Sequence, residues 1–297
     1  MTSVLHLDGV DRSFDGRQVL SDVTFDVAAG RLTGFVGGNG AGKTTTMRII
    51  LGVLAPDAGQ VTWRGDRLTR DARRRFGYMP EERGLYPKMT TREQVAHLGR
   101  LYGLDAPAAR RRTDALLDRI GLGERGDDLL ETLSLGNQQR AQIAAALVHD
   151  PEVLILDEPF SGLDPLAVDT VVAVLRERAA AGAPVLFSSH QLDVVERICD
   201  DLVIIAGGTI RAAGPREELR AAYTLPRFEL VVDGDAGWLR DQAGVELVDL
   251  DGARAVFDLE PTVDDQSVLR AALARGPVRA FHPVTPSLAE IFREVNQ

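Results

Sequence analysis

The chain has 297 residues, a formal net charge of −10, and 44% hydrophobic and 26% charged residues. This length holds one large α/β domain and a smaller one, and the acidic balance argues against a nucleic-acid-binding protein. The apolar runs have the length of strands, which excludes a membrane-spanning helix, and the single cysteine, Cys199, is typical of a reducing compartment. Because the first ten residues show no export signal, we expect a cytoplasmic protein.

The N-terminal part of the chain carries a glycine-rich motif between a predicted strand and a predicted helix. Antiparallel strands are predicted around residues 4–7 and 23–27, then a strand at residues 31–36 and a helix at residues 45–51. The segment between the last two matches G-x-x-x-x-G-K-S/T and consists of Gly37, Gly38, Asn39, Gly40, Ala41, Gly42, Lys43 and Thr44.

The residue types of this motif suit a nucleoside triphosphate. Its glycines let backbone N–H groups converge on phosphates, Lys43 brings a mobile positive charge to the β- and γ-phosphates, and Thr44 offers a hydroxyl to Mg²⁺. The helix that follows points its partial positive N-terminus at the same phosphates. The alternative is a glycine-rich turn that happens to precede a helix; with the flanking strand and helix in place, the motif predicts nucleotide binding.

The middle of the chain is rich in predicted helices. They are expected at residues 91–102, 108–120 and 141–148. Ser134 would lie at or next to the start of the last of these, where a hydroxyl and free N–H groups make a second anion site.

Two carboxylates follow the next predicted strand, residues 153–156. Its apolar side chains do not alternate with polar ones, which indicates a strand buried on both faces of a parallel sheet. Such sheets bind ligands at the carboxyl ends of their strands, where Asp157 and Glu158 emerge. Asp157 would hold Mg²⁺ through water, opposite Thr44, and Glu158 would accept a proton from the attacking water. The alternative, a helix N-cap, is less favoured beside a phosphate-binding motif.

His190 ends another short buried strand, predicted at residues 185–189. A lone histidine after a strand is more often structural than catalytic. Here it lies at the same end of the same kind of sheet as the two carboxylates, which favours a catalytic role. A hairpin turn at residues 206–210 and a short helix at residues 215–219 follow, and Pro226 marks a linker.

The C-terminal part, residues 227–297, is predicted to be a small α+β accessory domain. Strands at residues 228–232, 245–250, 253–259 and 278–281 surround a helix at residues 266–275. A capping box at Ser287 opens a last amphipathic helix. We see no metal-ligand cluster here, and His282 is interpreted as a surface or packing residue. Dimer contacts and regulation both remain open as its role.

Taken in chain order, these motifs make residues 4–222 resemble the ATP-binding subunit of an ABC transporter. Residues 37–44 match the Walker A loop, residues 153–158 the Walker B strand with its catalytic glutamate, and residues 133–137 resemble the LSGGQ signature. Residues 161–164, which end at Asp164, match the D-loop, and His190 matches the switch histidine. Phe14 occupies the place of the aromatic residue that stacks on adenine, although a core phenylalanine is the alternative.

The resemblance implies an α/β fold of the P-loop NTPase type. Residues 1–222 would form the nucleotide-binding domain, with a RecA-like parallel sheet core, an antiparallel N-terminal portion and a helical subdomain at about residues 87–150. Residues 227–297 would form the C-terminal domain.

The resemblance also implies a site shared between two subunits, with ATP and Mg²⁺ as cofactors. One subunit would bind ATP through Phe14 and the Walker A segment up to Thr45, and its neighbour through Ser134, Leu135, Gly136 and Asn137. Asp164 would bridge the subunits of a homodimer or of a dimer with a paralogue. The partner implied is a separately encoded integral membrane permease, which places the chain on the cytoplasmic face of the cell membrane, and no nucleic acid is expected.

The sequence departs from the family pattern at several positions. Gly38 replaces the usual proline of the loop, Leu135 a glycine, and Asn137 a glutamine. Glu81 stands where most members have a glutamine that links Mg²⁺ to the membrane partner. An extra carboxylate there would either bind the metal more tightly or repel the γ-phosphate. Alternatively, Glu81 lies at the tip of a loop and does not reach the metal.

Two classes of function stay open. The resemblance favours an exporter-type ATPase related to the bacterial sodium-efflux system. The alternative is a soluble ABC ATPase acting on the ribosome or DNA, whose members usually carry fused nucleotide domains or basic extensions. An ATP-gated switch with little turnover is disfavoured by the presence of both Glu158 and His190.

Overall fold

The computed structural model describes residues 3–82, 84–223, 225–285 and 287–295. Contacts divide the chain into two compact units, Met1–Arg216 and Glu217–Gln297. The sequence placed the division at residues 222–227, so the two boundaries differ by about the length of one short helix, Arg216–Tyr223. No helix within the described ranges has both the length and the hydropathy that crossing a bilayer requires.

The first unit contains two sheets. Its strands are β1 (Ser3–Phe14), β2 (Arg17–Ala28), β3 (Leu32–Val36), β4 (Ala58–Trp63), β5 (Asp66–Arg67), β6 (Phe76–Met79), β7 (Val153–Leu156), β8 (Val185–Ser189), β9 (Asp201–Ala206) and β10 (Thr209–Pro215). One sheet is four-stranded, in the order β2-β1-β4-β5, and its pairs are antiparallel. The other is six-stranded, in the order β10-β9-β3-β8-β7-β6.

The six-stranded sheet is parallel from β9 to β6, and only β10 runs against its neighbour. Every residue of β3, β7 and β8 is buried. The lack of alternation in the sequence predicted this for β7, and β8 was also predicted to be a buried strand. Val36 pairs with Ser189, and Leu156 with Phe187. The carboxyl ends of these three strands therefore meet at one edge, which positions the segments that follow them.

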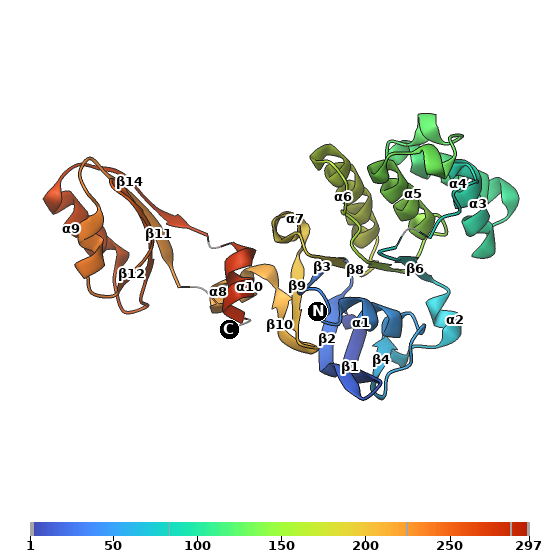
Figure 1. The fold of residues 1–297 in the computed structure, drawn as a ribbon, viewed down its shortest axis with the longest axis horizontal. Helices are drawn as coiled ribbons and strands as arrows, with labels where there is room; N and C mark the ends of the chain where they lie inside the picture. The colour runs from blue at the N-terminus through green and yellow to red at the C-terminus, as the bar shows by residue number, and fades with distance from the viewer. Residues whose placement is uncertain (1–2, 83, 224, 286, 296–297) are drawn as a thin grey trace. The chain divides into compact units, whose positions relative to one another are not determined.

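Helices cover both faces of this sheet. They are α1 (Lys43–Ile50), α2 (Arg70–Arg73), α3 (Thr91–Leu101), α4 (Ala106–Arg119), α5 (Leu135–Leu147), α6 (Pro165–Ala180) and α7 (Leu192–Ile198), with short 3₁₀ helices at Gly123–Arg125 and Leu130–Thr132. Figure 1 shows α1 on one side of the sheet and α5 and α6 on the other. Met47 and Ile50 of α1 share a core with Phe25 of β2 and Ile155 of β7, so α1 is packed between the two sheets.

The predicted helix at residues 141–148 is longer than expected. It begins at Leu135, because the Ser134 hydroxyl accepts the Asn137 N–H at 3.4 Å and caps the first turn. The sequence did not indicate this start, because residues 136–140 are glycine and polar residues and show no helical spacing of apolar side chains.

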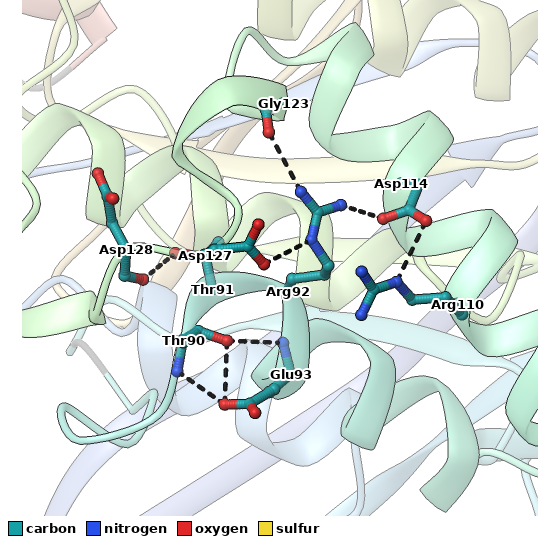
Figure 2. A network of polar contacts seen from close by, with 9 residues as sticks. All are labelled: Thr90, Thr91, Arg92, Glu93, Arg110, Asp114, Gly123, Asp127 and Asp128. Atoms are coloured by element: carbon teal, nitrogen blue, oxygen red, sulfur yellow. Dashed lines mark hydrogen bonds and ion pairs between the residues drawn. The ribbon is translucent and has the colours of Figure 1, made fainter.

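The helical segment is held together around Arg92, near the start of α3 (Figure 2). Its guanidinium contacts Asp114 of α4 and Asp127, at 3.0 Å, and donates to the Gly123 carbonyl at 3.3 Å. A capping box between Thr90 and Glu93 closes the first turn of α3. One half-buried arginine thus joins two helices and the loop that leads toward α5.

Cys199 lies between α7 and β9 and is 2% exposed. Burial raises the pKa of its thiol to about 12. The side chain behaves as a small core residue.

The second unit is a four-stranded antiparallel sheet with helices. Its elements are α8 (Arg216–Tyr223), β11 (Arg227–Val232), a 3₁₀ helix (Gly237–Asp241), β12 (Val245–Asp251), β13 (Arg254–Leu259), α9 (Asp265–Arg275), β14 (Val278–Val284) and α10 (Leu288–Val295). The strand order is β12-β13-β11-β14. Val268 and Ala272 of α9 pack on Leu230 and Phe257 of the sheet, and Figure 1 shows α9 lying against it.

Candidate nucleotide site

The carboxyl edge of the six-stranded sheet opens into a cavity of about 720 Å³. It is lined by Arg17, Gln18, Val19, Asn39, Gly40, Ala41, Gly42, Lys43, Thr44, Thr45, Glu81, Asp157, Glu158, His190, Gly207 and Gly208. The fold thus brings the glycine-rich motif together with Glu81, the two carboxylates after β7 and the histidine after β8. These groups are far apart in the sequence and meet because their strands are neighbours.

The glycine-rich loop wraps around the start of α1. Gly42 precedes the helix with φ of 112°, and a Cβ there would lie 2.5 Å from the Leu20 side chain, so only glycine fits. Lys43 is 9% exposed, and its Nζ donates to the carbonyls of Gly37 at 2.7 Å and Gly38 at 3.2 Å. Its charge is held beside the loop, where the N-terminus of α1 adds a favourable field for anions.

Asp157 is buried, at 1% exposed, with one of its two oxygens satisfied. Oδ1 accepts the Ser188 hydroxyl at 2.5 Å, whereas Oδ2 has no hydrogen-bond partner among the described residues. A buried carboxylate oxygen without a partner is costly unless a cation or donor joins it. Asp157, with Thr44 and Glu81 on the same cavity, therefore fits Mg²⁺, which takes oxygen ligands.

Mg²⁺ at such sites is held by few protein groups and completed by phosphates and water. The described part of the chain contains no group of three or more His, Cys, Asp or Glu placed to hold a metal by themselves.

Glu158 has an unusual backbone conformation and a fixed position. Its φ is 52°, a region that residues other than glycine seldom adopt. The Ser188 hydroxyl accepts its N–H at 2.8 Å, and the Gln139 amide donates to its carbonyl at 2.8 Å. Its carboxylate lies 2.9 Å from Nδ1 of His190, whose side chain is 58% exposed at the cavity. The arrangement places a carboxylate and an imidazole in contact beside the phosphate-binding loop.

The residues of the predicted signature lie elsewhere. Within the described ranges, Ser134, Leu135, Gly136 and Asn137 do not line the cavity. Ser134 caps α5, and Leu135 is 58% exposed. A Cβ on Gly136 would lie 3.0 Å from the Gly162 carbonyl, so this turn packs against the segment before Asp164.

Two further predicted residues have structural contacts of their own. Asp164 is exposed and caps α6 by accepting the Ala167 N–H at 2.9 Å. Phe14, at the end of β1, is 38% exposed, and the Arg12 guanidinium lies 4.7 Å from its ring centroid. In the part of the chain that the structure describes, Phe14 does not line the cavity. Its role at adenine stays a prediction.

Sequence reasoning missed one wall of the cavity. Arg17, Gln18 and Val19 come from the start of β2, and Gly207 and Gly208 from the β9–β10 turn. Backbone pairing brings these two segments together, because the Ser21 N–H donates to the Gly208 carbonyl at 2.9 Å. The turn itself was predicted, but no sequence period indicates which turns meet beside a loop.

Two family models match the chain. Residues 20–161 match the one described as ABC transporter. Residues 214–296 match the one described as ATP-binding protein DrrA1-3-like, C-terminal domain.

Curated relatives and solved structures agree with these matches. The chain is 34% identical over 293 residues to "Uncharacterized ABC transporter ATP-binding protein YhaQ" of Bacillus subtilis, covering 98% of each chain. It is 38% identical to "Nod factor export ATP-binding protein I" of Paraburkholderia xenovorans, covering 87% of this chain and 88% of the relative. A solved "ATP binding subunit of ABC transporter" superposes with a TM-score of 0.69 at 35% identity, over 74% of this chain and 93% of that one.

Proposed function

Since this chain belongs to the family of ABC transporter ATP-binding proteins, we propose that it energises a membrane exporter whose permease is a separate polypeptide. Members of the family bind ATP with Mg²⁺ and hydrolyse ATP to power transport, so the chain is an ATPase and a subunit of a transporter complex. Export is supported by the name of the Paraburkholderia relative, which is 38% identical. The cargo would be recognised by the permease.

The contact between Glu158 and His190 carries the catalytic part of the proposal. With their side chains 2.9 Å apart at the cavity, Glu158 accepts a proton from the attacking water, and His190 orients Glu158 and contacts the γ-phosphate. Glu158 is 10% exposed, so it is shielded from bulk water and its position is defined. A carboxylate held in this way is suited to general-base catalysis.

Phosphate binding uses the loop and its lysine. Lys43 exchanges the Gly37 and Gly38 carbonyls for the β- and γ-phosphates, while the N–H groups of residues 39–45 surround them. Mg²⁺, when bound, neutralises charge on the phosphates. Thr44 and the unpartnered Oδ2 of Asp157 would hold it, and Glu81 would add a third oxygen ligand from the same cavity.

The signature residues are proposed to serve a second subunit. Ser134, Leu135, Gly136 and Asn137 lie outside their own chain's cavity within the described ranges, and Leu135 is exposed. A γ-phosphate held by another copy, or by a paralogue, would meet the N-terminus of α5 and the Ser134 hydroxyl. Asp164, exposed beside this turn, would bridge the subunits. One chain thus holds half of each site.

The remaining contacts are proposed from the family and from composition. Phe14 stacks on adenine after Arg12 moves from its ring. The chain lies on the cytoplasmic face of the cell membrane, bound to its permease. No nucleic acid is a partner, in keeping with the net charge of −10.

ATP turnover against protein concentration tests the shared site. We expect turnover to rise more steeply than linearly, and Glu158→Gln to lower it by about 100-fold or more while trapping an ATP-bound dimer in size-exclusion chromatography with Mg²⁺. Glu229→Gln, a carboxylate on the C-terminal sheet, is the matched control and leaves turnover unchanged. Concentration-independent turnover by a monomer would contradict the proposal.

The permease is tested separately. We expect an adjacent reading frame to encode about six apolar spans of about 20 residues each, and its product to copurify with this chain. A product that leaves ATP turnover unchanged would count against the exporter assignment.

A further inference from the structure

Side chains of helix α5 form hydrogen bonds to both loops that carry the carboxylates of the cavity. Gln139 and Gln142 are each 3% exposed. The Gln139 amide donates to the Glu158 carbonyl at 2.8 Å. The Gln142 amide donates to the carbonyls of Pro80 and Glu82, both at 3.0 Å, and so holds the backbone on either side of Glu81.

These two glutamines occupy one face of a single rigid element. Positions three apart on a helix are neighbours, so Gln139 and Gln142 project together. The helix backbone is seated directly on the sheet, since a Cβ on Gly77 of β6 would lie 2.4 Å from the Ala146 carbonyl. Ser134, at the capped start of α5, is five residues from Gln139, or about 7.5 Å along the axis.

Glu158 depends on these hydrogen bonds more than a residue in a common backbone conformation would. A residue with φ of 52° keeps that conformation only when its surroundings hold it. Ser188 of β8 holds the N–H of Glu158, and Gln139 holds its carbonyl. The Ser161 N–H also donates to this carbonyl, at 3.3 Å, so loss of the Gln139 amide removes the shorter of its two hydrogen bonds and leaves the longer, weaker one.

We propose that Gln139 and Gln142 are positioning residues, through which helix α5 sets the Glu158 and Glu81 loops relative to the signature residues at its N-terminus. This rests on the proposed function, which gives Glu158 and the signature their roles. A contact made by Ser134 with a second subunit's nucleotide is then transmitted along α5 to the same chain's own carboxylates. Each chain would thereby couple the two ATP sites that it helps to form.

Variants of equal size on α5 test this in the full chain. Gln139→Met keeps the side-chain volume and removes the donor; we expect kcat to fall about tenfold with ATP affinity unchanged and the chain still folded. Gln142→Met is expected to raise the Mg²⁺ concentration needed for half-maximal turnover about threefold, because it frees the Glu81 loop. Gln138→Met is the matched control: its amide bonds the carbonyls of Leu130 and Leu133 and reaches neither loop. Its turnover stays within about twofold of wild type.

A double-mutant cycle separates positioning from packing. Because Gln139 acts through Glu158, Gln139→Met added to Glu158→Gln should lower residual turnover no further. If Gln139→Met does not fold, Gln139→Asn, one methylene too short to reach the carbonyl, replaces it in the cycle. An additive loss in the double variant, or an unchanged kcat in the single one, overturns the inference.

The proposed function fails by a different result. If Glu158→Gln keeps wild-type turnover, the catalytic assignment is wrong. If Glu158→Gln abolishes turnover while Gln139→Met leaves kcat unchanged, only the role of α5 is wrong.

Discussion

The two units of the chain offer a contrast between a buried carboxylate and a buried arginine. In the first unit, Asp157 Oδ2, His149 Nδ1 and Thr33 Oγ1 are buried with no partner among the described residues. In the second, Arg227 is 11% exposed and bonds both Asp258, at 2.7 Å, and Glu290. Unsatisfied buried groups cost stability, so a protein keeps them where a ligand or a conformational need offsets the cost. Asp157 shows this at the proposed Mg²⁺ site.

Two more arginines of the C-terminal sheet are, by contrast, paired with carboxylates. Arg254 bonds Glu229 at 2.6 Å and Asp249 at 2.9 Å, and Arg279 pairs with Asp233 at 2.5 Å. Such pairs fix the side chains across neighbouring strands. In this comparison the carboxylate oxygen without a partner lies in the first unit and the paired arginines in the second, and the contrast can be broken or sharpened by experiment.

The largest expected effect concerns His149, which stacks on Tyr102 with centroids 3.6 Å apart. Burial lowers the pKa of its imidazole from 6.5 to about 4. The unfolded chain therefore binds more protons between these pH values, and stability is complete above pH 6.5 and falls as pH drops toward 4. The difference corresponds to about 3 kcal/mol.

His149→Phe should remove this pH dependence. The measurement is denaturant unfolding from pH 7 to pH 4, followed by Trp63 fluorescence in a Trp238→Phe background. Parallel pH profiles for the two proteins would show that His149 is not the titrating group.

Lys43→Ala should weaken ATP binding by about 50-fold, because it removes a charge-assisted contact to the phosphates. Titration with a fluorescent ATP analogue measures this. Lys88→Ala, which removes an exposed lysine paired with Glu131, is the control and should bind like wild type. Equal weakening in both variants would point to a nonspecific charge effect.

Ser188→Ala should destabilise the first unit by about 2 kcal/mol, because it leaves the Glu158 N–H and Asp157 Oδ1 unbonded. Thr33→Val is the matched case: its hydroxyl is equally buried but has no partner among the described residues, so its loss should be neutral or stabilising. Chemical denaturation compares the two. Similar losses in both variants would remove the distinction between bonded and unbonded hydroxyls.

The smallest effect is expected in the C-terminal unit. Arg227→Met should lower its stability by about 1 kcal/mol while ATP affinity stays unchanged. The unfolding of this unit is followed by the fluorescence of Trp238. This signal is the difference between the protein with both tryptophans and the Trp238→Phe variant. Arg279→Met, at an exposed pair, is the control and should leave the midpoint unchanged. A change in ATP affinity with Arg227→Met would show that the two units do not act separately.

Much of the fold and of the ligand set could be predicted from sequence. The P-loop fold class, ATP hydrolysis, the ATP and Mg²⁺ cofactors and the resemblance to ABC transporter subunits are confirmed by the comparisons. These succeeded because buried parallel strands such as β7 lack alternation and because the phosphate-binding loop has a fixed spacing.

What escaped prediction depends on contacts that leave no local pattern. Gln139 lies before the helix predicted at residues 141–148 and reads as an ordinary polar residue, yet it reaches Glu158. Ser188 lies in an apolar strand, and the residues next to it in the sequence do not indicate a hydrogen bond to Asp157. The roles of Phe14, Glu81 and the signature residues stay predictions, because each depends on a nucleotide or on a second chain.

The buried Cys199 makes this protein convenient to label. A thiol whose pKa is raised to about 12 is almost entirely protonated at neutral pH, and only the thiolate reacts with maleimides. The chain has no other cysteine. A cysteine introduced at an exposed position would therefore carry a dye alone, without removal of the native residue. Two such cysteines, one introduced on each unit, would carry a donor and an acceptor dye. Energy transfer between the dyes would report the distance between the labelled positions during ATP turnover.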